Sequence, residues 1–253
     1  MSPDPELPAN VALCRELIQR LSALEEDRAR VLRHLSHELK TPLAVLREGV
    51  ALLKEGTLGA LTTEQGEVVR ILQHNLSSLQ RRIEGLLDYH ATMSDFSRPQ
   101  CRRVAVRELL DAVVADHQLQ AQSRALRLSV VCDLDSVLLD PDKMRVALSN
   151  LLSNAIDFSP HGGEIRLAAM RGGENASWLW FDCIDQGAGI PDSEVEQIFD
   201  PFVQGSRRRT GVDRGSGIGL SLVREAALAQ GGRAFMVPAP RGAHFRMEIP
   251  NDE

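Results

Sequence analysis

The chain has 253 residues, of which 43% are hydrophobic and 25% are charged, and its formal net charge is -6. At roughly 100–200 residues per domain, this length allows one large domain or two modest ones, and the composition excludes collagen-like and wholly disordered chains. Two Trp, one Tyr and seven Phe are too few for the stacking platforms of a single-strand binder, which also needs a basic groove. General nucleic-acid binding is therefore not expected.

The four cysteines, at positions 14, 101, 132 and 183, are widely spaced and form no C-x-x-C pair. This spacing argues against a zinc ribbon or a redox motif and suits a reducing compartment. The sequence has no run of about 18 apolar residues, and its first residues lack the basic-then-apolar order of a signal peptide. As given, the chain is expected to be soluble and cytoplasmic.

The first hundred residues are predicted to be mainly helical. Apolar residues recur at alternating steps of four and three from Leu17 to Leu35, with Arg28 as one polar position, as in the a/d pattern of a coiled coil. Gly56 and Gly59 break the pattern, and residues 62–65 (Thr-Thr-Glu-Gln) offer a capping box for a second helix. The apolar stripe of that helix consists of Val68, Leu72, Leu76, Leu79, Ile83 and Leu86.

Two such helices form a hairpin whose own core is poor. A symmetric pair of hairpins packed as a four-helix bundle is the simplest remedy, so the pattern predicts a homodimer. The segment Asp95–Arg103, which contains Ser97 and Pro99, is interpreted as a linker.

Beyond this linker, short β-like runs are mixed with helical ones. The predicted strands are Leu126–Cys132, Glu164–Met170, Ser177–Ile184, Arg233–Val237 and His244–Ile249, and the predicted helices are Arg107–Gln122, Asp142–Phe158 and Ser216–Ala229. This order favours helices on one face of a mixed sheet. The predicted fold is therefore a multidomain α and α+β chain, in which an antiparallel helical hairpin, forming a dimeric four-helix bundle, precedes an α/β sandwich.

The first candidate for chemistry lies in the segment Ser36–Pro42. At roughly 100° per residue, His37 lies about 200° around the helix from Leu35, so its ring is expected to point into solvent. A neutral imidazole is a nucleophile near pH 7, and Glu38 is placed to accept its proton or hold its tautomer. The zinc-protease motif H-E-x-x-H is excluded because its last position is Thr41. Taken alone, the motif also fits an ordinary surface histidine.

Two glycine-rich segments lie in the second half of the chain. Residues 185–191 (Asp-Gln-Gly-Ala-Gly-Ile-Pro) follow a predicted strand, and residues 215–220 (Gly-Ser-Gly-Ile-Gly-Leu) precede a predicted helix. Glycines at such points let backbone N–H groups face an anion such as phosphate. Neither segment is a Rossmann fingerprint, and the chain has no Walker A lysine after a glycine.

Asn150 and Asn154 are one turn apart on a predicted helix and share a face. An amide oxygen can ligate a hard cation such as Mg²⁺, which proteins usually bind together with substrate phosphates. Two solvated surface asparagines are the alternative.

In their order along the chain, these segments resemble the cytoplasmic core of a bacterial sensor histidine kinase of two-component signalling. The similar segments are His37–Leu43 for the H box, Asn150–Asn154 for the N box, Asp185–Gly189 for the G1 box, Ile198–Phe202 for the F box and Gly215–Leu220 for the G2 box. The resemblance implies a dimerisation and histidine phosphotransfer hairpin, followed by an ATP-binding domain of the histidine kinase, gyrase and Hsp90 type.

This resemblance implies that His37 attacks the γ-phosphate of ATP while Glu38 assists proton removal. The phosphoryl group then passes to an aspartate in the receiver domain of a response regulator, and Thr41 occupies the position that orients water for dephosphorylating that partner. Asn154 is implied as the ligand of Mg²⁺, with Asn150 beside it.

The resemblance also implies the contacts to the nucleotide. Asp185 would accept a hydrogen bond from the adenine amino group, and residues 203–214 would form a lid over the phosphates. The other implied nucleotide-binding residues are Gly187, Gly189, Ile190, Phe199, Arg214, Gly215, Gly217, Gly219 and Leu220.

Three regions are implied along the chain: a signal-relay helix at residues 1–30 that resembles the end of a HAMP-type region, the hairpin at 31–97 and the catalytic ATP-binding domain at 98–253. The native full-length protein is expected in the bacterial inner membrane, with this part in the cytoplasm. Contact with the membrane is expected only through segments upstream of this chain.

Two other interpretations stay open. A hydrolysing machine of the gyrase, Hsp90 or mismatch-repair kind carries Glu four residues before the Mg²⁺-binding Asn, and Asn150 is a poor base at that position. A dimeric ATP-binding scaffold, or a phosphatase-biased relative with weak kinase activity, is favoured by Asp157, which stands where the family commonly has a basic residue facing the phosphates. Either a lid arginine such as Arg214 compensates for this acid, or ATP binds weakly.

Overall fold

The computed structural model describes Arg20, Val31 and residues 38–57, 59–96, 99–206 and 216–251. The chain divides into two compact units, Met1–Ser94 and Asp95–Glu253. Most of the predicted coiled-coil stretch from Leu17 to Leu35 lies outside the described residues.

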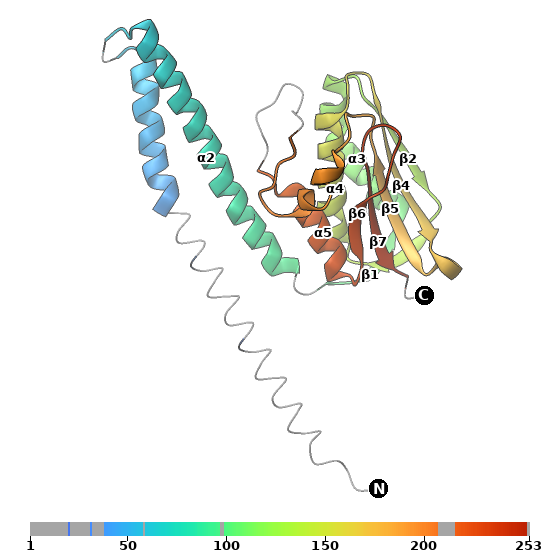
Figure 1. The fold of residues 1–253 in the computed structure, drawn as a ribbon. Coiled ribbons are helices and arrows are strands. Elements are labelled where there is room, and N and C mark those ends of the chain that lie inside the picture. Colours follow the sequence, from blue (N-terminus) through green and yellow to red (C-terminus); the bar gives the residue numbers. More distant parts are fainter. Residues whose placement is uncertain are drawn as a thin grey trace. The chain divides into compact units, whose positions relative to one another are not determined.

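The first unit contains the predicted helical hairpin (Figure 1). Residues 38–54 form one continuous helix, and α2 spans Thr63–Phe96. Gly56 and Gly59 adopt positive φ angles of 72° and 116° in the connection, a conformation that glycine takes without steric cost. The predicted capping box is confirmed, because the Thr62 amide donates to Oε1 of Gln65 and the Gln65 amide donates to Oγ1 of Thr62.

Side chains join the two helices of the hairpin in antiparallel register. Arg47 donates to Gln80 at 3.4 Å, and Lys54, seven residues later, donates to Gln73, seven residues earlier. Among the described residues of the hairpin, the buried large apolar ones are Leu43, Val50 and Val69.

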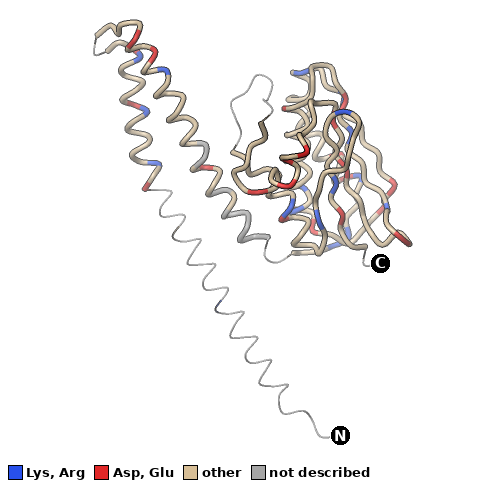
Figure 2. The backbone as a smooth tube through the Cα atoms, in the orientation of Figure 1, with Lys and Arg blue, Asp and Glu red and all other residues tan. Residues whose placement is uncertain are grey.

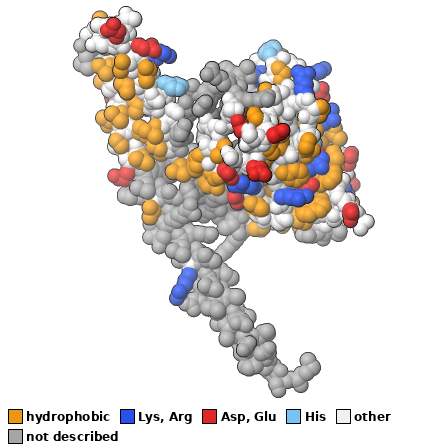
Figure 3. All heavy atoms as spheres, in the orientation of Figure 1, with side chains coloured by type: hydrophobic (Ala, Val, Ile, Leu, Met, Phe, Trp, Pro, Cys, Tyr) orange, Lys and Arg blue, Asp and Glu red, His pale blue; other side chains and the backbone are white. Residues whose placement is uncertain are grey.

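A second apolar face of the hairpin is exposed in the single chain (Figure 3). Three of the six residues predicted for the α2 stripe, Val68, Leu72 and Leu79, lie on it. Among the described residues of the hairpin, the exposed large apolar ones are Val31, Leu39, Val45, Leu46, Leu52, Val68, Ile71, Leu72 and Leu79. An apolar face of this extent is typical of a surface that another element covers.

The second unit is a sandwich of a mixed sheet with helices on one face (Figure 1). Its strands are β1 (Arg102–Ala105), β2 (Arg127–Cys132), β3 (Ser136–Leu139), β4 (Glu164–Gly172), β5 (Trp178–Ile184), β6 (Arg233–Met236) and β7 (His244–Pro250). Its α-helices are α3 (Val106–Ser123), α4 (Pro141–Phe158) and α5 (Gly219–Ala229), and the 3-10 helices η1 (Glu174–Ala176), η2 (Asp192–Glu194) and η3 (Gln197–Phe199) lie in loops.

The main sheet has the strand order β2-β4-β5-β7-β6, with β2 and β4 parallel and the other neighbours antiparallel. Alternate residues of a strand face opposite sides, so on β5 Leu179, Phe181 and Cys183 enter the core while Trp180 and Asp182 lie on the other face. The largest fully buried side chains are Leu110, Leu139, Met144, Leu148, Leu151, Leu152, Ile156, Ile165, Leu167, Leu179, Phe181 and Met247. The predicted α/β sandwich is confirmed.

The sequence pattern missed two short strands. β1 and β3 form a separate antiparallel ribbon in which Arg102 pairs with Leu139 and Ala105 with Ser136. The segment predicted as a linker therefore overlaps β1 at its end, while α2 runs on to Phe96 at its start. The helix predicted from Ser216 begins at Gly219.

Acidic and basic side chains are interspersed along both units rather than gathered into one basic surface (Figure 2). In the part of the chain that the structure describes, no helix combines the length and the apolar character needed to cross a bilayer.

Candidate nucleotide site

Helix α4 carries the two asparagines and begins at a cap that the sequence encodes. Asp140 is the N-cap, where its Oδ1 accepts hydrogen bonds from the amides of Asp142 and Lys143, and Pro141 occupies the first helical position. Both features are typical of helix starts, because the first turn has unsatisfied N–H groups and proline fits its backbone angles.

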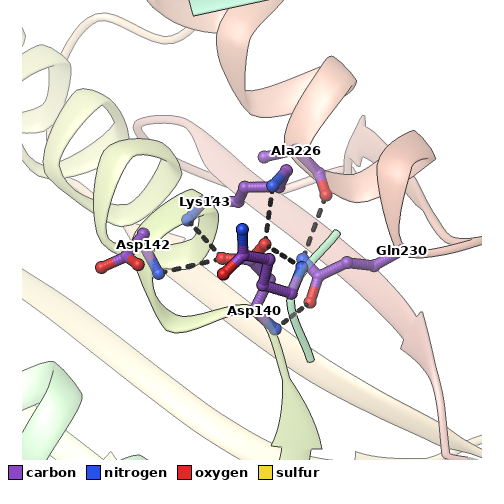
Figure 4. A network of polar contacts seen from close by, with 6 residues as sticks. Asp140, Asp142, Lys143, Ala226 and Gln230 are labelled. Atoms are coloured by element: carbon purple, nitrogen blue, oxygen red, sulfur yellow. Dashed lines mark hydrogen bonds and ion pairs between the residues drawn. The ribbon is translucent and has the colours of Figure 1, made fainter. Parts of the chain in front are cut away.

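Asp140 also connects α4 with the segment at Gln100 through its carboxylate, and with Gln230 after α5 through its backbone amide (Figure 4). Its Oδ2 accepts from Nζ of Lys143 at 2.6 Å and from the amide of Gln100 at 2.7 Å. The amide of Asp140 donates to Oε1 of Gln230, whose Nε2 donates to the carbonyl of Ala226 on α5. Burial alone would raise the pKa of Asp140, but the hydrogen bonds from Nζ of Lys143 and from the amides of Gln100 and Lys143 hold that pKa below its ordinary value.

Asn150 and Asn154 lie on α4 opposite the first residue of α5. Nδ2 of Asn150 donates to the carbonyl of Val146, which fixes the plane of the amide. A Cβ on Gly219 would lie 2.8 Å from Oδ1 of Asn150 and 3.6 Å from Nδ2 of Asn154. The absence of a side chain at Gly219 therefore lets the start of α5 approach both amides.

Asp185 follows β5 and is only 5% exposed. Its Oδ1 accepts hydrogen bonds from the amides of Gly187 and Ala243, at 2.7 and 3.1 Å. Burial raises the pKa of the Asp185 carboxyl above its ordinary value, and the two amide donors only partly offset that effect. These two contacts engage one oxygen of a buried carboxylate, an arrangement suited to binding a donor on its second oxygen.

The glycines around Asp185 bring backbone segments together. A Cβ on Gly187 would lie 2.7 Å from the carbonyl oxygen of Phe158, the last residue of α4. Gly189 has φ +72° and would meet the carbonyl oxygen of Gly242 at 2.8 Å. The loop after β5 is thus in contact with the end of α4 and with the loop between β6 and β7.

The predicted F box packs against the start of the α5 segment. Phe199 is buried and meets Phe245 edge to face at 6.1 Å, and Asp200 pairs with Arg224 of α5 at 2.9 Å. The amide of Phe202 donates to the carbonyl of Gly217, which has φ +77°. This hydrogen bond brings together Phe202 and Gly217, which flank the predicted lid segment.

The remaining predicted site residues are placed as follows. Ile190 and Leu220 are half-buried, and Glu38 and Thr41 are exposed on the described part of the first hairpin helix. His37, Arg214 and Gly215 lie outside the described residues.

The position of Asp157 gives no support to the expectation that this residue faces the phosphates. Its side chain is 7% exposed, and Oδ1 lies 3.5 Å from Nε2 of Gln120 on α3. Arg124, at the end of α3, donates to the carbonyl oxygens of Ile156 and Ser159. The end of α4 is therefore held against α3, and Asp157 belongs to that contact.

Two residues with roles in this geometry were not predicted from the sequence. Gly242 and Ala243 precede β7. The carbonyl of Ala243 accepts a hydrogen bond from the amide of Asp185, and the amide of Ala243 donates to the Asp185 carboxylate. A single glycine before a strand was the one available signal. Its pairing with a residue 57 positions earlier is a tertiary contact that no local pattern shows.

The arrangement fits a nucleotide better than a protein-bound metal cluster. Among the described residues, no group of three or more His, Cys, Asp or Glu side chains is placed to hold a metal ion. The asparagine amides offer neutral oxygen ligands, as Mg²⁺ accepts when phosphates and water complete its shell. Asp185 offers the buried acceptor that a base amino group needs.

Known families match both units. Residues 27–91 match the His Kinase A (phospho-acceptor) domain, and residues 139–253 match the histidine kinase-, DNA gyrase B-, and HSP90-like ATPase family. Sensor histidine kinase GlrK of Escherichia coli K12 is 39% identical over 238 residues, which are 94% of this chain and 49% of GlrK. Alginate biosynthesis sensor protein KinB of Pseudomonas aeruginosa is 31% identical over 90% of this chain and 38% of KinB. The chain thus spans about half the length, or less, of these curated relatives.

Solved structures show the same architecture. Full-length ShkA in complex with AMPPNP matches with a TM-score of 0.61 and 26% identity, over 87% of this chain and 45% of ShkA. The catalytic domain of the histidine kinase ThkA shares the fold, with a TM-score of 0.52 and 23% identity over 60% of this chain and 96% of that domain. The chain therefore belongs to the bacterial sensor histidine kinases of two-component signalling, with their phospho-acceptor and ATP-binding domains.

Proposed function

We propose that this chain phosphorylates its own His37 from ATP and passes the phosphoryl group to an aspartate of a response regulator. The observation that carries the proposal is the buried Asp185 carboxylate, held on one oxygen by two amides. Helix α4 contacts Gly187 through Phe158 and presents Asn150 and Asn154 to Gly219. One helix therefore borders both the proposed base site at Asp185 and the proposed phosphate site at the asparagines.

In this proposal each residue group has a separate task. Asp185 accepts from the adenine amino group, and Gly187, Gly189 and Ile190 border the base and sugar. The phosphate end of the nucleotide is held by Asn150, Asn154, Gly217, Gly219 and Leu220, and by Arg214 and Gly215 of the lid. Phe199, which packs against Phe245, supports this end. Asn154 would hold Mg²⁺, which when bound neutralises charge on the phosphates.

Phosphoryl transfer takes place in two steps, from ATP to His37 and from His37 to the aspartate of the response regulator. A ring nitrogen of His37 attacks the γ-phosphorus, the bond to the β-phosphate oxygen breaks and ADP leaves, while the imidazole proton passes to Glu38. In the second step an aspartate oxygen of the response regulator forms a bond to phosphorus, the phosphorus–nitrogen bond breaks, and the imidazole regains its proton from Glu38. Because little covalent chemistry falls to the protein, positioning and charge dominate the rate.

The test of this proposal is the variant His37→Gln. The 253-residue chain, incubated with γ-labelled ATP and Mg²⁺, is expected to acquire acid-labile, base-stable label. The variant His37→Gln is expected to acquire none. His74→Gln, at an exposed histidine of α2, is the matched control and is expected to label normally. Label persisting in His37→Gln would refute the assignment, and normal ATP binding without label in the wild type would favour the dimeric scaffold.

We further propose that two copies of the hairpin pack through the exposed apolar face into a four-helix bundle. The double variant Leu72→Glu/Leu79→Glu is expected to be monomeric, because two buried carboxylates at a dimer contact are unpaired. Light scattering after size exclusion would show the mass fall from about twice to about once 27.9 kDa. Leu119→Glu, at an 81% exposed residue of α3, is the control and should stay dimeric; a dimeric double variant would contradict the proposal.

Dephosphorylation of the response regulator with Thr41 orienting water is proposed as a second reaction of the same hairpin, because Thr41 is exposed one turn after position 37. The buried position of Asp157 beside Gln120 weakens the argument for a phosphatase-biased scaffold. We also propose that the native full-length protein places this part on the cytoplasmic side of the bacterial inner membrane, since residues 1–30 resemble the end of a HAMP-type region.

A further inference from the structure

The loop between β6 and β7, residues 237–243, lies against the candidate adenine-binding carboxylate. Its base is closed by the amide of Val237, which donates to the carbonyl of His244 at 2.8 Å. Its far end reaches Asp185, where the amide of Ala243 donates to Oδ1 and the carbonyl of Ala243 accepts from the amide of Asp185. The loop therefore contacts both the backbone and the side chain of Asp185.

Gly242 is the point of closest approach between this loop and Asp185. A Cβ on Gly242 would lie 1.9 Å from the carbonyl oxygen of Asp185 and 3.0 Å from its Oδ1, and φ at Gly242 is +74°. A Cβ on Gly189 would in turn lie 2.8 Å from the carbonyl oxygen of Gly242. The two loops thus interlock at glycines, and neither can accept a side chain at these points without moving the other.

The direction of the Asp185 carboxylate follows from this interlock. With Oδ1 bound by the amides of Gly187 and Ala243, rotation about the last side-chain bond would break one or both contacts. A carboxylate that is only 5% exposed gains few replacement hydrogen bonds from water. The second oxygen is therefore held in one direction by groups from two loops.

We propose that Gly242 is a positioning residue for base selection, and that the β6–β7 loop orients Asp185 toward the amino group of a 6-aminopurine. This inference rests on the proposed function, in which Asp185 binds adenine. It adds an element that the motifs of the sequence do not include. Displacing the loop turns the carboxylate and weakens discrimination at position 6 of the purine, while the phosphate contacts of Asn150 and Asn154 on α4 stay in place.

The test compares ATP with inosine triphosphate, which has an oxygen in place of the amino group, in the full chain. Wild type is expected to prefer ATP, and Gly242→Ala is expected to reduce that preference by about tenfold or more, as the loss of one charged hydrogen bond does. Gly162→Ala is the matched control, because Gly162 has φ +75° and nothing within 4 Å of its Cβ position. It carries the same backbone strain without the contact, and should keep the wild-type preference.

The possible outcomes separate the two proposals. A wild type with no preference for ATP overturns the adenine role of Asp185 and this inference with it. A wild-type preference that Gly242→Ala retains, or that Gly162→Ala loses equally, overturns this inference alone.

A measurement on the wild type covers the case in which Gly242→Ala does not fold. The amide protons of Gly187 and Ala243 are expected to shift together along the titration curve of the Asp185 carboxyl, followed by NMR in the absence of nucleotide. An Ala243 amide that does not follow this titration would show that the loop does not hold the carboxylate.

Discussion

Asp185→Asn is expected to weaken ATP binding roughly 100-fold while leaving the nucleotide-free protein at least as stable as the wild type. The asparagine oxygen can keep both hydrogen bonds that Oδ1 accepts from the amides of Gly187 and Ala243. Its NH₂ group then replaces the second carboxylate oxygen, so a donor faces the adenine amino group, which is also a donor. Isothermal titration with ATP measures the loss of affinity.

The stability part of this expectation follows from the raised pKa of Asp185. A group whose pKa is raised on folding binds its proton more tightly in the folded state, so stability falls as pH rises from its unfolded pKa through its folded pKa. At neutral pH the ionised Asp185 is therefore a burden on the fold, and a neutral asparagine removes it. Thermal unfolding at pH 7 is expected to show an unchanged or higher midpoint in Asp185→Asn.

Base preference should also reverse in this variant, because the asparagine NH₂ can donate to the oxygen at position 6 of hypoxanthine. Asp185→Asn is thus expected to bind inosine triphosphate at least as well as ATP. A variant that still prefers ATP as strongly as wild type would contradict the role given to Asp185.

Asp182, three residues earlier on β5, is the matched control. It is also buried, but Arg246 donates to both of its oxygens at 2.7 and 2.8 Å. Burial alone would raise the pKa of Asp182, yet the hydrogen bonds from Arg246 and the nearby Nε2 of His244, at 3.2 Å, hold that pKa below the ordinary value. Asp182→Asn is therefore expected to lower stability without changing base preference, the reverse of Asp185→Asn.

The elements with strong periodicity could be predicted from the sequence, and the weakly patterned ones could not. Helix α4 has an N-cap, a proline at its first position and an apolar stripe, so its range was predicted within one residue. Strands β1 and β3 have four residues each, too few for an alternation signal. The sequence alone predicts a linker at Arg102 and Arg103, because their pairing with β3 is a tertiary contact that no local pattern shows.

The candidate site shows the same division. The shared face of Asn150 and Asn154 followed from helical spacing, but their approach to Gly219 depends on packing between α4 and α5. Asp157 was expected to face phosphates because its motif position suggested it, whereas its neighbour Gln120 comes from a different helix. Local spacing gives the face of a residue and leaves its partner undetermined.

A large loss of stability is expected from Asp140→Ala, about 3–5 kcal/mol. Asp140 is 2% exposed and Lys143 is 7% exposed, so Asp140→Ala removes a buried carboxylate that lies 2.6 Å from the buried ammonium of Lys143. The variant also removes the cap of α4 and the acceptor for the amide of Gln100. Because folded proteins are stable by only about 5–15 kcal/mol, a loss of this size is a large share of the total.

The pair is expected to be asymmetric, which separates the charge effect from simple loss of contacts. In Lys143→Met the Asp140 carboxylate keeps three backbone donors, from Gln100, Asp142 and position 143. Its loss of stability should be about 1–2 kcal/mol. Asp111→Ala, which breaks an exposed ion pair with Arg107 on α3, is the surface control and should cost less than about 1 kcal/mol.

Urea unfolding followed by tryptophan fluorescence measures these differences in the full chain, because both tryptophans, Trp178 and Trp180, lie on β5 of the second unit. The lowered pKa of Asp140 fixes the pH dependence: its stabilisation is complete above the unfolded pKa of about 3.9 and is lost as pH falls through the folded pKa. The gap between wild type and Asp140→Ala should therefore be constant near neutral pH and shrink below about pH 4. A gap under about 1 kcal/mol at pH 7, or one that does not shrink in acid, would show that the buried pair does not hold the linker end at Gln100 against the start of α4.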